Sequence, residues 1–322
     1  MFDWKRWLAP VILLIVIIVL PLVYDDDRIL TLAVLTFVIA GLAASWNIVG
    51  GFAGQISLGH AAFFGIGSLV TRQLWLGGLP LAVSIIAALL ATAAAALLIG
   101  YPALRLRGIY FSIGTLALAV AIRITVDNVF PGISALPVAD LRDYSLVPRY
   151  YLSFGTLLLT IIVSIYLTHS RLGLGMMAVR EDEDAARSIG VNIFRYKLAA
   201  FMISASLAGL IGSSFAFFHV SYYPSLPFVA EWTFDAIIVT FIGGIGTVAG
   251  PLIGAVFFVL VRDVLATNFV HIHLIVFGAI FILVVLLLPG GMMEAWDRFK
   301  IWRGRSSKEA TISPTPDLSN DS

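Results

Sequence analysis

The 322-residue chain contains no cysteine and few charged residues. The lack of cysteine excludes disulfide bonds, thiolate metal sites and cysteine nucleophiles. Only 12% of the residues are charged, whereas 60% are hydrophobic, and the mean hydropathy is +1.00. Soluble domains average about 45–50% apolar residues. A soluble core could not absorb this much apolar surface, so the composition predicts a protein that is solvated by lipid.

The motifs that bind nucleotides or perform covalent chemistry are also lacking. No Gly-Lys-Ser/Thr occurs, so the chain has no Walker A phosphate loop, and any ATP that drives it must bind another chain. Ser213 and Ser214 precede His219 but lack the flanking glycine of a nucleophile elbow. The histidines form no metal-binding pattern; they are His60, His169, His219, His271 and His273. We expect no enzymatic activity, cofactor, metal or nucleic-acid partner.

Eight apolar segments approach the length that a helix needs to cross the bilayer. That length is roughly 20 residues for about 30 Å of hydrocarbon. The segments are 8–23, 29–49, 60–76, 79–101, 108–126, 150–169, 197–219 and 270–289. The first is followed by three aspartates instead of a small-residue cleavage site, so we expect an uncleaved span. The sequence predicts an all-α polytopic membrane protein with roughly eight full transmembrane helices and one broken helix pair.

The basic residues predict the orientation, because Lys and Arg are enriched in cytoplasmic loops. Fourteen of the 20 basic residues fall in four clusters. The clusters are Lys5 and Arg6; Arg105 and Arg107; Arg171, Arg180, Arg187, Arg195 and Lys197; and Arg298, Lys300, Arg303, Arg305 and Lys308. We expect these clusters and both termini inside, and the 127–149 loop outside. The tail 304–322 is rich in Ser, Thr, Pro and Asp and is expected to be disordered.

The broken helix pair is predicted in segment 232–265, which is too long for one span. Because both 171–197 and the C-terminus are placed inside, an even number of crossings must separate them, and two spans already do so. The segment should then return to its starting side as a hairpin of two short helices, broken between Gly243 and Pro251. The alternative is that a span elsewhere in the chain is wrongly assigned. Such a break is tolerated only in the protein interior, and half-helices often line transport pathways.

Two glycine-rich segments, 48–64 and 241–258, resemble each other. In the predicted topology they open from opposite sides of the membrane, as an inverted repeat would. Close helix packing through small residues is the other interpretation, and both stay open. The candidate pathway residues are Gly50, Gly51, Gln55, Ser57, His60, Gly243, Gly244, Gly246, Thr247 and Gly250.

Three charged pairs stand at the predicted outer ends of apolar segments. They are Arg123 with Asp127, Glu231 with Asp235, and Arg262 with Asp263. Charges in such places face a bundle interior or a cavity, because lipid disfavours them. They are interpreted as interfacial ion pairs or as an outer mouth at which a soluble protein delivers substrate.

A charged island between Arg171 and Lys197 interrupts this apolar sequence. It predicts a short helix from about Glu181, with acidic residues at its start, as the helix dipole favours. Gly190 and Asn192 can end the helix. Ala185 and Ala186 would offer a flat surface, and Ile189 an exposed apolar side chain, to a docking protein. An ordinary charged loop is the alternative.

The chain resembles the permeases of bacterial branched-chain amino acid ABC transporters of the LivM type, over about 32–289. The resemblance is carried by Ser45–Gly51 with Gly54–Ala61, by Leu106–Ser112, by Ala178–Glu183 through Gly190–Asn192, and by Phe241–Gly254. It implies a permease domain, 1–303, with 171–197 as its cytoplasmic coupling loop. The residues implied to contact the ATPase are Glu181, Asp184, Ala185, Ala186, Ile189 and Gly190. Asp184 stands where the family pattern has glutamate.

The same resemblance implies partners and a substrate. The partners are a second homologous permease, two cytoplasmic ABC ATPases, a periplasmic binding protein and the lipid bilayer. The implied substrates are leucine, isoleucine and valine, carried across the bacterial inner membrane. Relatives import urea, amides or other amino acids, which keeps those substrates open. An ion-coupled secondary carrier is the other class, but it would need an unpaired carboxylate near the middle of the membrane.

Overall fold

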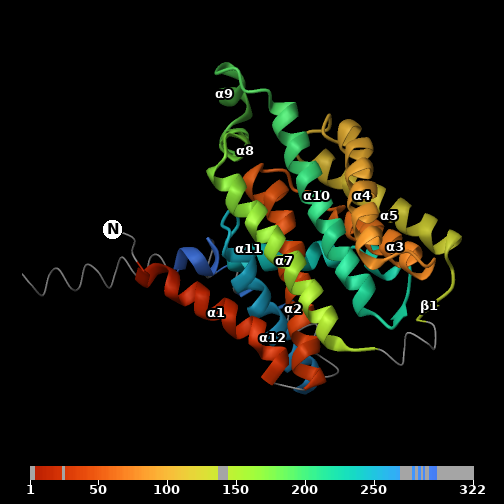
Figure 1. Ribbon diagram of the computed structural model, residues 1–322. Coiled ribbons are helices and arrows are strands. Elements are labelled where there is room, and N and C mark those ends of the chain that lie inside the picture. Colours follow the sequence, from red (N-terminus) through yellow and green to blue (C-terminus); the bar gives the residue numbers. More distant parts are fainter. Residues whose placement is uncertain are drawn as a thin grey trace, which may run out of the picture.

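The computed structural model describes residues 4–23, 26–136 and 144–268, and near the C-terminus 278–279, 282–283, 286 and 290–295. The predicted span 270–289 lies largely, and the predicted tail 304–322 entirely, outside the described residues. The described chain is built from helices, with one two-stranded antiparallel sheet (Figure 1).

The helices and strands follow the apolar segments closely. In chain order they are α1 (Trp4–Val23), α2 (Asp27–Asn47), the π-helix η1 (Ile48–Phe52), α3 (His60–Leu76), α4 (Leu81–Ala103), α5 (Ile109–Val129), β1 (Ser134–Ala135), α7 (Leu146–His169), α8 (Arg171–Glu181), α9 (Glu183–Ser188), α10 (Ile193–Phe218), β2 (Ser221–Tyr222), the 3-10 turn η2 (Leu226–Phe228), α11 (Glu231–Gly243) and α12 (Gly250–Asn268).

Among the described residues, six helices are long and apolar enough to cross a membrane. They are α2 continued by η1, α4, α5, α7, α10 and α12. The chain is therefore a multi-pass helical membrane protein, as predicted, although the count of eight is not confirmed. The predicted span 60–76 corresponds to α3, which has 17 residues.

The packing of α10 shows the relative directions of its neighbours. Thr71 of α3 donates a hydrogen bond to Ser213 of α10, 2.8 Å away, and Gly67 lies against Gly209, so α3 runs parallel to α10. Gly209 also lies against Thr92 of α4, whereas Gly100 at the other end of α4 meets Phe201, so α4 runs antiparallel. These directions agree with the alternation predicted from the basic residues.

Helices α11 and α12 form the predicted hairpin. The backbone of Gly243 lies against that of Gly250, and Gly254 lies against Val239, so the helices are antiparallel. At their far ends Arg262 forms a salt bridge of 3.2 Å with Asp235. The segment thus returns to the end of the bundle at which it began. Only α11, with 13 residues, is short; the prediction of two short helices was wrong for α12, whose 19 residues suffice for a span.

The centre of the bundle is formed by α2 and α10. About two thirds of the apolar window of each is buried (67% and 72%), against 22% for α4 and for α5, which therefore lie at the periphery. Small residues make the close packing possible. A Cβ added at Gly212 of α10 would overlap the carbonyl oxygen of Phe64 in α3.

Arg72, whose role could not be predicted from its neighbours in the sequence, is fully buried near the end of α3. Its guanidinium donates to the carbonyl oxygens of Ser134, Ala216, His219 and Val220 at 2.6–3.2 Å. These carbonyls belong to β1, to the last turn of α10 and to the chain that leaves α10. One arginine therefore fastens the β1–β2 end of the molecule to α3.

Replacing Gly212 by alanine should destabilise the bundle by about 1–3 kcal/mol, the usual cost of overpacking a filled core. The apparent melting temperature of the purified protein in detergent would report the loss. Gly155→Ala in α7 is the matched control, since a Cβ there meets no heavy atom within 4 Å. Equal melting temperatures for the two variants would contradict the close approach of α3 and α10.

Candidate functional site: the α8–α9 loop and the glycine junction

The loop between α7 and α10 contains two consecutive helices. Asp182 separates them, in an extended conformation with φ −158°. Its carboxylate accepts hydrogen bonds from the backbone amides of Asp184 and Ala185 at 2.8 and 3.0 Å, which makes it the N-cap of α9. The predicted helix start at about Glu181 was therefore wrong: Glu181 is the last residue of α8.

Gly190 ends α9 with a positive φ of 84°, as predicted. Its amide donates to the carbonyl oxygen of Arg187 at 3.0 Å. Asn192 does not end α9. Its side chain accepts from the amide of Arg195 at 3.2 Å and so caps the start of α10.

The two alanines of α9 lie on different faces. Ala185 is exposed, but Ala186 is only 3% exposed and packs into the permease. The expectation that both form the docking surface was wrong, because an α-helix turns consecutive side chains to different sides. Ile189 is 76% exposed and matches the predicted apolar side chain. Glu181, Asp184 and Gly190 are also exposed.

An ion pair holds α9 against the bundle. Lys197 of α10 lies 2.5 Å from the carboxylate of Glu183, and its side chain is only 6% exposed. The Glu183 side chain is 36% exposed. This contact joins the first turn of α9 to the first turns of α10. Because the pair is partly buried, salt screens it less than a surface pair.

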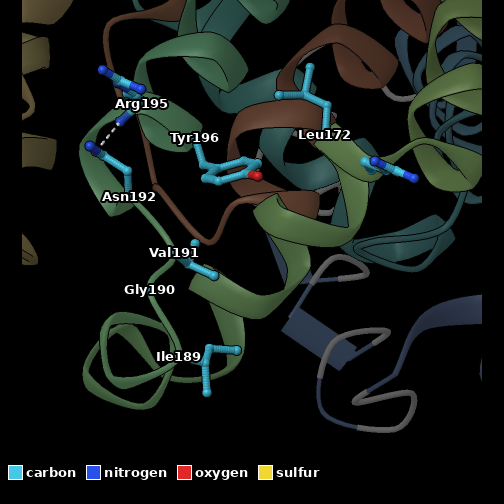
Figure 2. A pocket seen from close by; sticks show the side chains of 8 residues that line it. Leu172, Ile189, Gly190, Val191, Asn192, Arg195 and Tyr196 are labelled. Carbon is cyan, nitrogen blue, oxygen red and sulfur yellow. Dashed lines mark hydrogen bonds between the residues drawn. The ribbon is translucent and has the colours of Figure 1, made fainter.

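A groove of about 450 Å³ opens beside α9 (Figure 2). It is lined by Arg171, Leu172, Ile189, Gly190, Val191, Asn192, Arg195 and Tyr196. Two arginines and three aliphatic side chains make the surface of this groove partly basic and partly apolar. Tyr196 packs against Gly175 of α8, so the two helices that form the groove are in direct contact.

The two glycine-rich segments meet near the α8 end of the molecule. The side chain of Asn47 donates to the carbonyl oxygen of Thr247 and accepts from the amide of Gly246, both at 2.8 Å. Arg180 of α8 donates to the carbonyl oxygen of Gly51. The expectation that the segments open on opposite sides was wrong. Helix α11 runs alongside α2 in the same direction, which brings its glycine turn to the end of α2.

Of the remaining glycine candidates, Gly50 lies apart and the others share one turn. Gly50 lies beneath the ring of Trp46, where a Cβ would overlap the ring. Gly244 has a φ of 128°, and Thr247 closes the same turn by donating to its carbonyl oxygen at 2.8 Å. Gly250 donates its amide to the Thr247 hydroxyl at 3.0 Å. The structure thus brings Gly51, Gly243, Gly244, Gly246, Thr247 and Gly250 into one junction.

His60 lies apart from this junction and is fully buried. Its Nε2 is 3.2 Å from the hydroxyl of Ser45 and 3.4 Å from that of Ser204. Both hydroxyl hydrogens already bond to backbone carbonyls, so Nε2 must carry the proton in these contacts. Gln55 and Ser57 are buried as well. Their burial beside α2 leaves their role in a pathway as a prediction.

The features considered above for hydrolysis and metal binding do not form such sites in the described part of the chain. Ser213 bonds to Thr71 and Gly209, and Ser214 donates to Ile211, so neither forms a pair with histidine. Burial, with a further contribution from Arg72, lowers the pKa of His219 and favours its neutral form. No group of three potential metal ligands occurs in the described part of the chain.

The outer charges are paired in a partly unexpected way. Arg123 and Asp127 lie 3.9 Å apart, as their spacing predicted. Arg262 pairs with Asp235, whereas Asp263 pairs with Arg28 of α2 at 3.1 Å. Pairs between helices that are distant in sequence could not be read from spacing alone.

The described chain is thus a multi-pass helical bundle with a charged loop of two short helices at one end. The chain belongs to the family described as "Branched-chain amino acid transport system / permease component", which matches residues 28–285. The high-affinity branched-chain amino acid permease proteins LivM of Salmonella typhimurium (strain LT2) and Escherichia coli (strain K12) are each 30% identical to it. Each match covers 90% of this chain and 75% of the relative.

A second kind of relative matches a shorter stretch. It is the high-affinity branched-chain amino acid transport system permease protein LivH of Salmonella typhimurium. The two sequences are 29% identical over 140 residues, which cover 43% of this chain and 44% of that protein. No solved structure matches the chain.

Removing the cap of α9 should loosen that helix without affecting the bundle. Asp182→Ala eliminates both hydrogen bonds to the first turn, a change that costs roughly 0.5–2 kcal/mol at N-caps. Hydrogen exchange of the 183–188 amides should accelerate, while exchange in α10 stays the same. Asp182→Asn, which keeps an acceptor oxygen, is the control. Equal exchange in all three proteins would show that the cap does not hold α9.

Proposed function

We propose that this chain is the permease subunit of an ATP-driven importer in the bacterial inner membrane and carries leucine, isoleucine and valine. The family and the LivM relatives support the transport function and the substrate class. The observation that supports coupling to ATP is helix α9, which is exposed on one side, is capped by Asp182 and lies beside a groove. Urea, amides and other amino acids remain the alternative substrates.

In this proposal an ATPase docks on α9 through Ala185, Ile189 and Gly190. Ile189 supplies the apolar contact, and the exposed carboxylates of Glu181 and Asp184 contribute charge. The chain has no phosphate-binding loop of its own, so the nucleotide is held by the partner. The groove beside α9 receives a side chain from that partner.

The complete transporter would contain two homologous permeases, two ATPases and a periplasmic binding protein. The existence of LivM and LivH as two permease proteins of one named system, both similar to this chain, supports the pairing. The peripheral helices α4 and α5 have the exposed apolar surface that lipid or a second permease would cover.

The pairing of charges favours ATP coupling over ion coupling. Asp127, Asp235 and Asp263 each lie within 3.9 Å of an arginine side-chain nitrogen. A carboxylate that carries a proton or a sodium ion through a transport cycle has to be free to change partners. Fixed pairs near the ends of helices suit a structural role.

Ile189→Asp should weaken docking of the ATPase and lower ATP-driven uptake about tenfold or more, because it puts a charge at the centre of an apolar contact. Retention of the ATPase during purification of the complex measures docking directly. Ile133→Asp is the matched control, an equally polar change at an isoleucine that is 56% exposed beyond α5. Full retention of the ATPase by Ile189→Asp would remove α9 as the docking site.

The orientation can be tested because the natural chain has no cysteine. A cysteine at Ser188, in α9, should react with a membrane-impermeant thiol reagent only from the cytoplasmic side. A cysteine at Ser221, exposed in β2, should react only from outside. Labelling of whole cells and of inverted vesicles distinguishes the two sides. The opposite pattern would reverse the topology and place α9 out of reach of a cytoplasmic ATPase.

A further inference from the structure

Three elements that are far apart in sequence meet at the glycine junction. The end of α2 with η1 contributes Asn47 and Gly51, the turn 244–249 contributes Gly246, and the last turn of α8 contributes Arg180. The last of these belongs to the docking loop, and Arg180 stands only two residues before Asp182, the cap of α9. The junction is therefore directly connected to the docking loop.

Arg180 contacts both glycine segments. Its guanidinium donates to the carbonyl oxygen of Gly51 and occupies the space that a Cβ of Gly246 would fill. Gly54 has a φ of 68° and lies against the backbone of Arg180. A Cβ added at Gly54 would lie only 3.2 Å from the Cα of Arg180. Side chains at these glycines would push Arg180 away, so the glycines make its approach possible.

Asn47 holds the two glycine segments together from the other side. Its amide uses one donor and one acceptor on the backbone of the turn. Aspartate could not donate and leucine could do neither, so asparagine is suited to this double contact. Gly51 fits there because it has no Cβ, which would overlap the Asn47 oxygen.

The segments joined in this way are irregular and can rearrange locally. η1 is a π-helix, in which the amide of Ala53 reaches the carbonyl oxygen of Ile48 at 3.3 Å. Single π-turns within helices are rare and frequently occur at functional sites. The turn 244–249 contains two glycines with positive φ, Gly244 and Gly246. A pull on either segment can change these turns without breaking the long helices.

We infer that Arg180 is a positioning residue that, together with Asn47, ties the docking loop to the two glycine turns, so that displacement of α9 changes their spacing. This inference rests on the proposed function. Through Arg180 the loop acts on the end of α2 and on the α11–α12 turn, and through the Glu183–Lys197 pair it acts on α10. Two connections then carry the partner's movement into the centre of the bundle.

The test uses the complete transporter in proteoliposomes and measures uptake, ATP hydrolysis and retention of the ATPase. Arg180→Gln should retain the ATPase and its hydrolysis but raise the ATP consumed per molecule transported about tenfold, as loss of a charged hydrogen bond would. Arg180→Lys keeps a charged donor and should recover part of the coupling. Arg107→Gln, at an exposed arginine of the turn after α4, is the matched control and should behave like the unaltered protein.

Three results would overturn the inference. The first is normal coupling in Arg180→Gln. The second is loss of the ATPase from Arg180→Gln, which would make Arg180 part of the docking surface. The third concerns Arg180→Lys, which is decisive if Arg180→Gln does not assemble. Because partial coupling is expected for Arg180→Lys, either fully normal coupling or a complete loss of coupling would contradict the inference. Failure of the proposed function is separate, because the unaltered complex would then show no ATP-driven uptake, whereas full ATPase retention by Ile189→Asp would remove only the docking site.

Discussion

Every backbone amide and carbonyl that leaves a helix inside a membrane protein must find its partner within the protein, since lipid offers none. Polar side chains meet that requirement at several places in the described part of the chain, and three of them join segments that are distant in sequence. Asn47 satisfies the turn between α11 and α12, Arg180 satisfies the end of η1, and Arg72 satisfies the chain that leaves α10. The irregular parts of the structure depend on these side chains.

The same constraint explains where the candidate site lies. Regular helices satisfy their own backbone groups and can be packed through small residues alone, as α3 and α10 are. An irregular segment needs a polar neighbour, and that neighbour connects it to another part of the chain. The junction therefore brings together α2, α8 and the α11–α12 turn.

Much of the fold could be predicted because hydrophobic length and the distribution of basic residues determine it. The approximate positions of α4, α5 and α10, the hairpin predicted in 232–265 and the exposure of Ile189 follow from local sequence. The pairing of the glycine segments could not be predicted in this way. It depends on two helices that pack side by side although 200 residues separate Asn47 from Thr247. Arg72 and Asn47 were missed for the same reason: an isolated polar residue in an apolar run shows that a partner exists but not which one.

The inward face of α9 was also beyond sequence reasoning, and it determines how the helix can act. α9 has six residues, fewer than the roughly 12–15 that an isolated helix needs for stability in water. Its shape is therefore maintained by the permease, through the Asp182 cap, the Lys197 pair and the burial of Ala186. A helix held in this way cannot yield independently when a partner pushes on it. In the proposed coupling, the displacement passes to the groups that hold α9, which lead to α10 on one side and to Arg180 on the other.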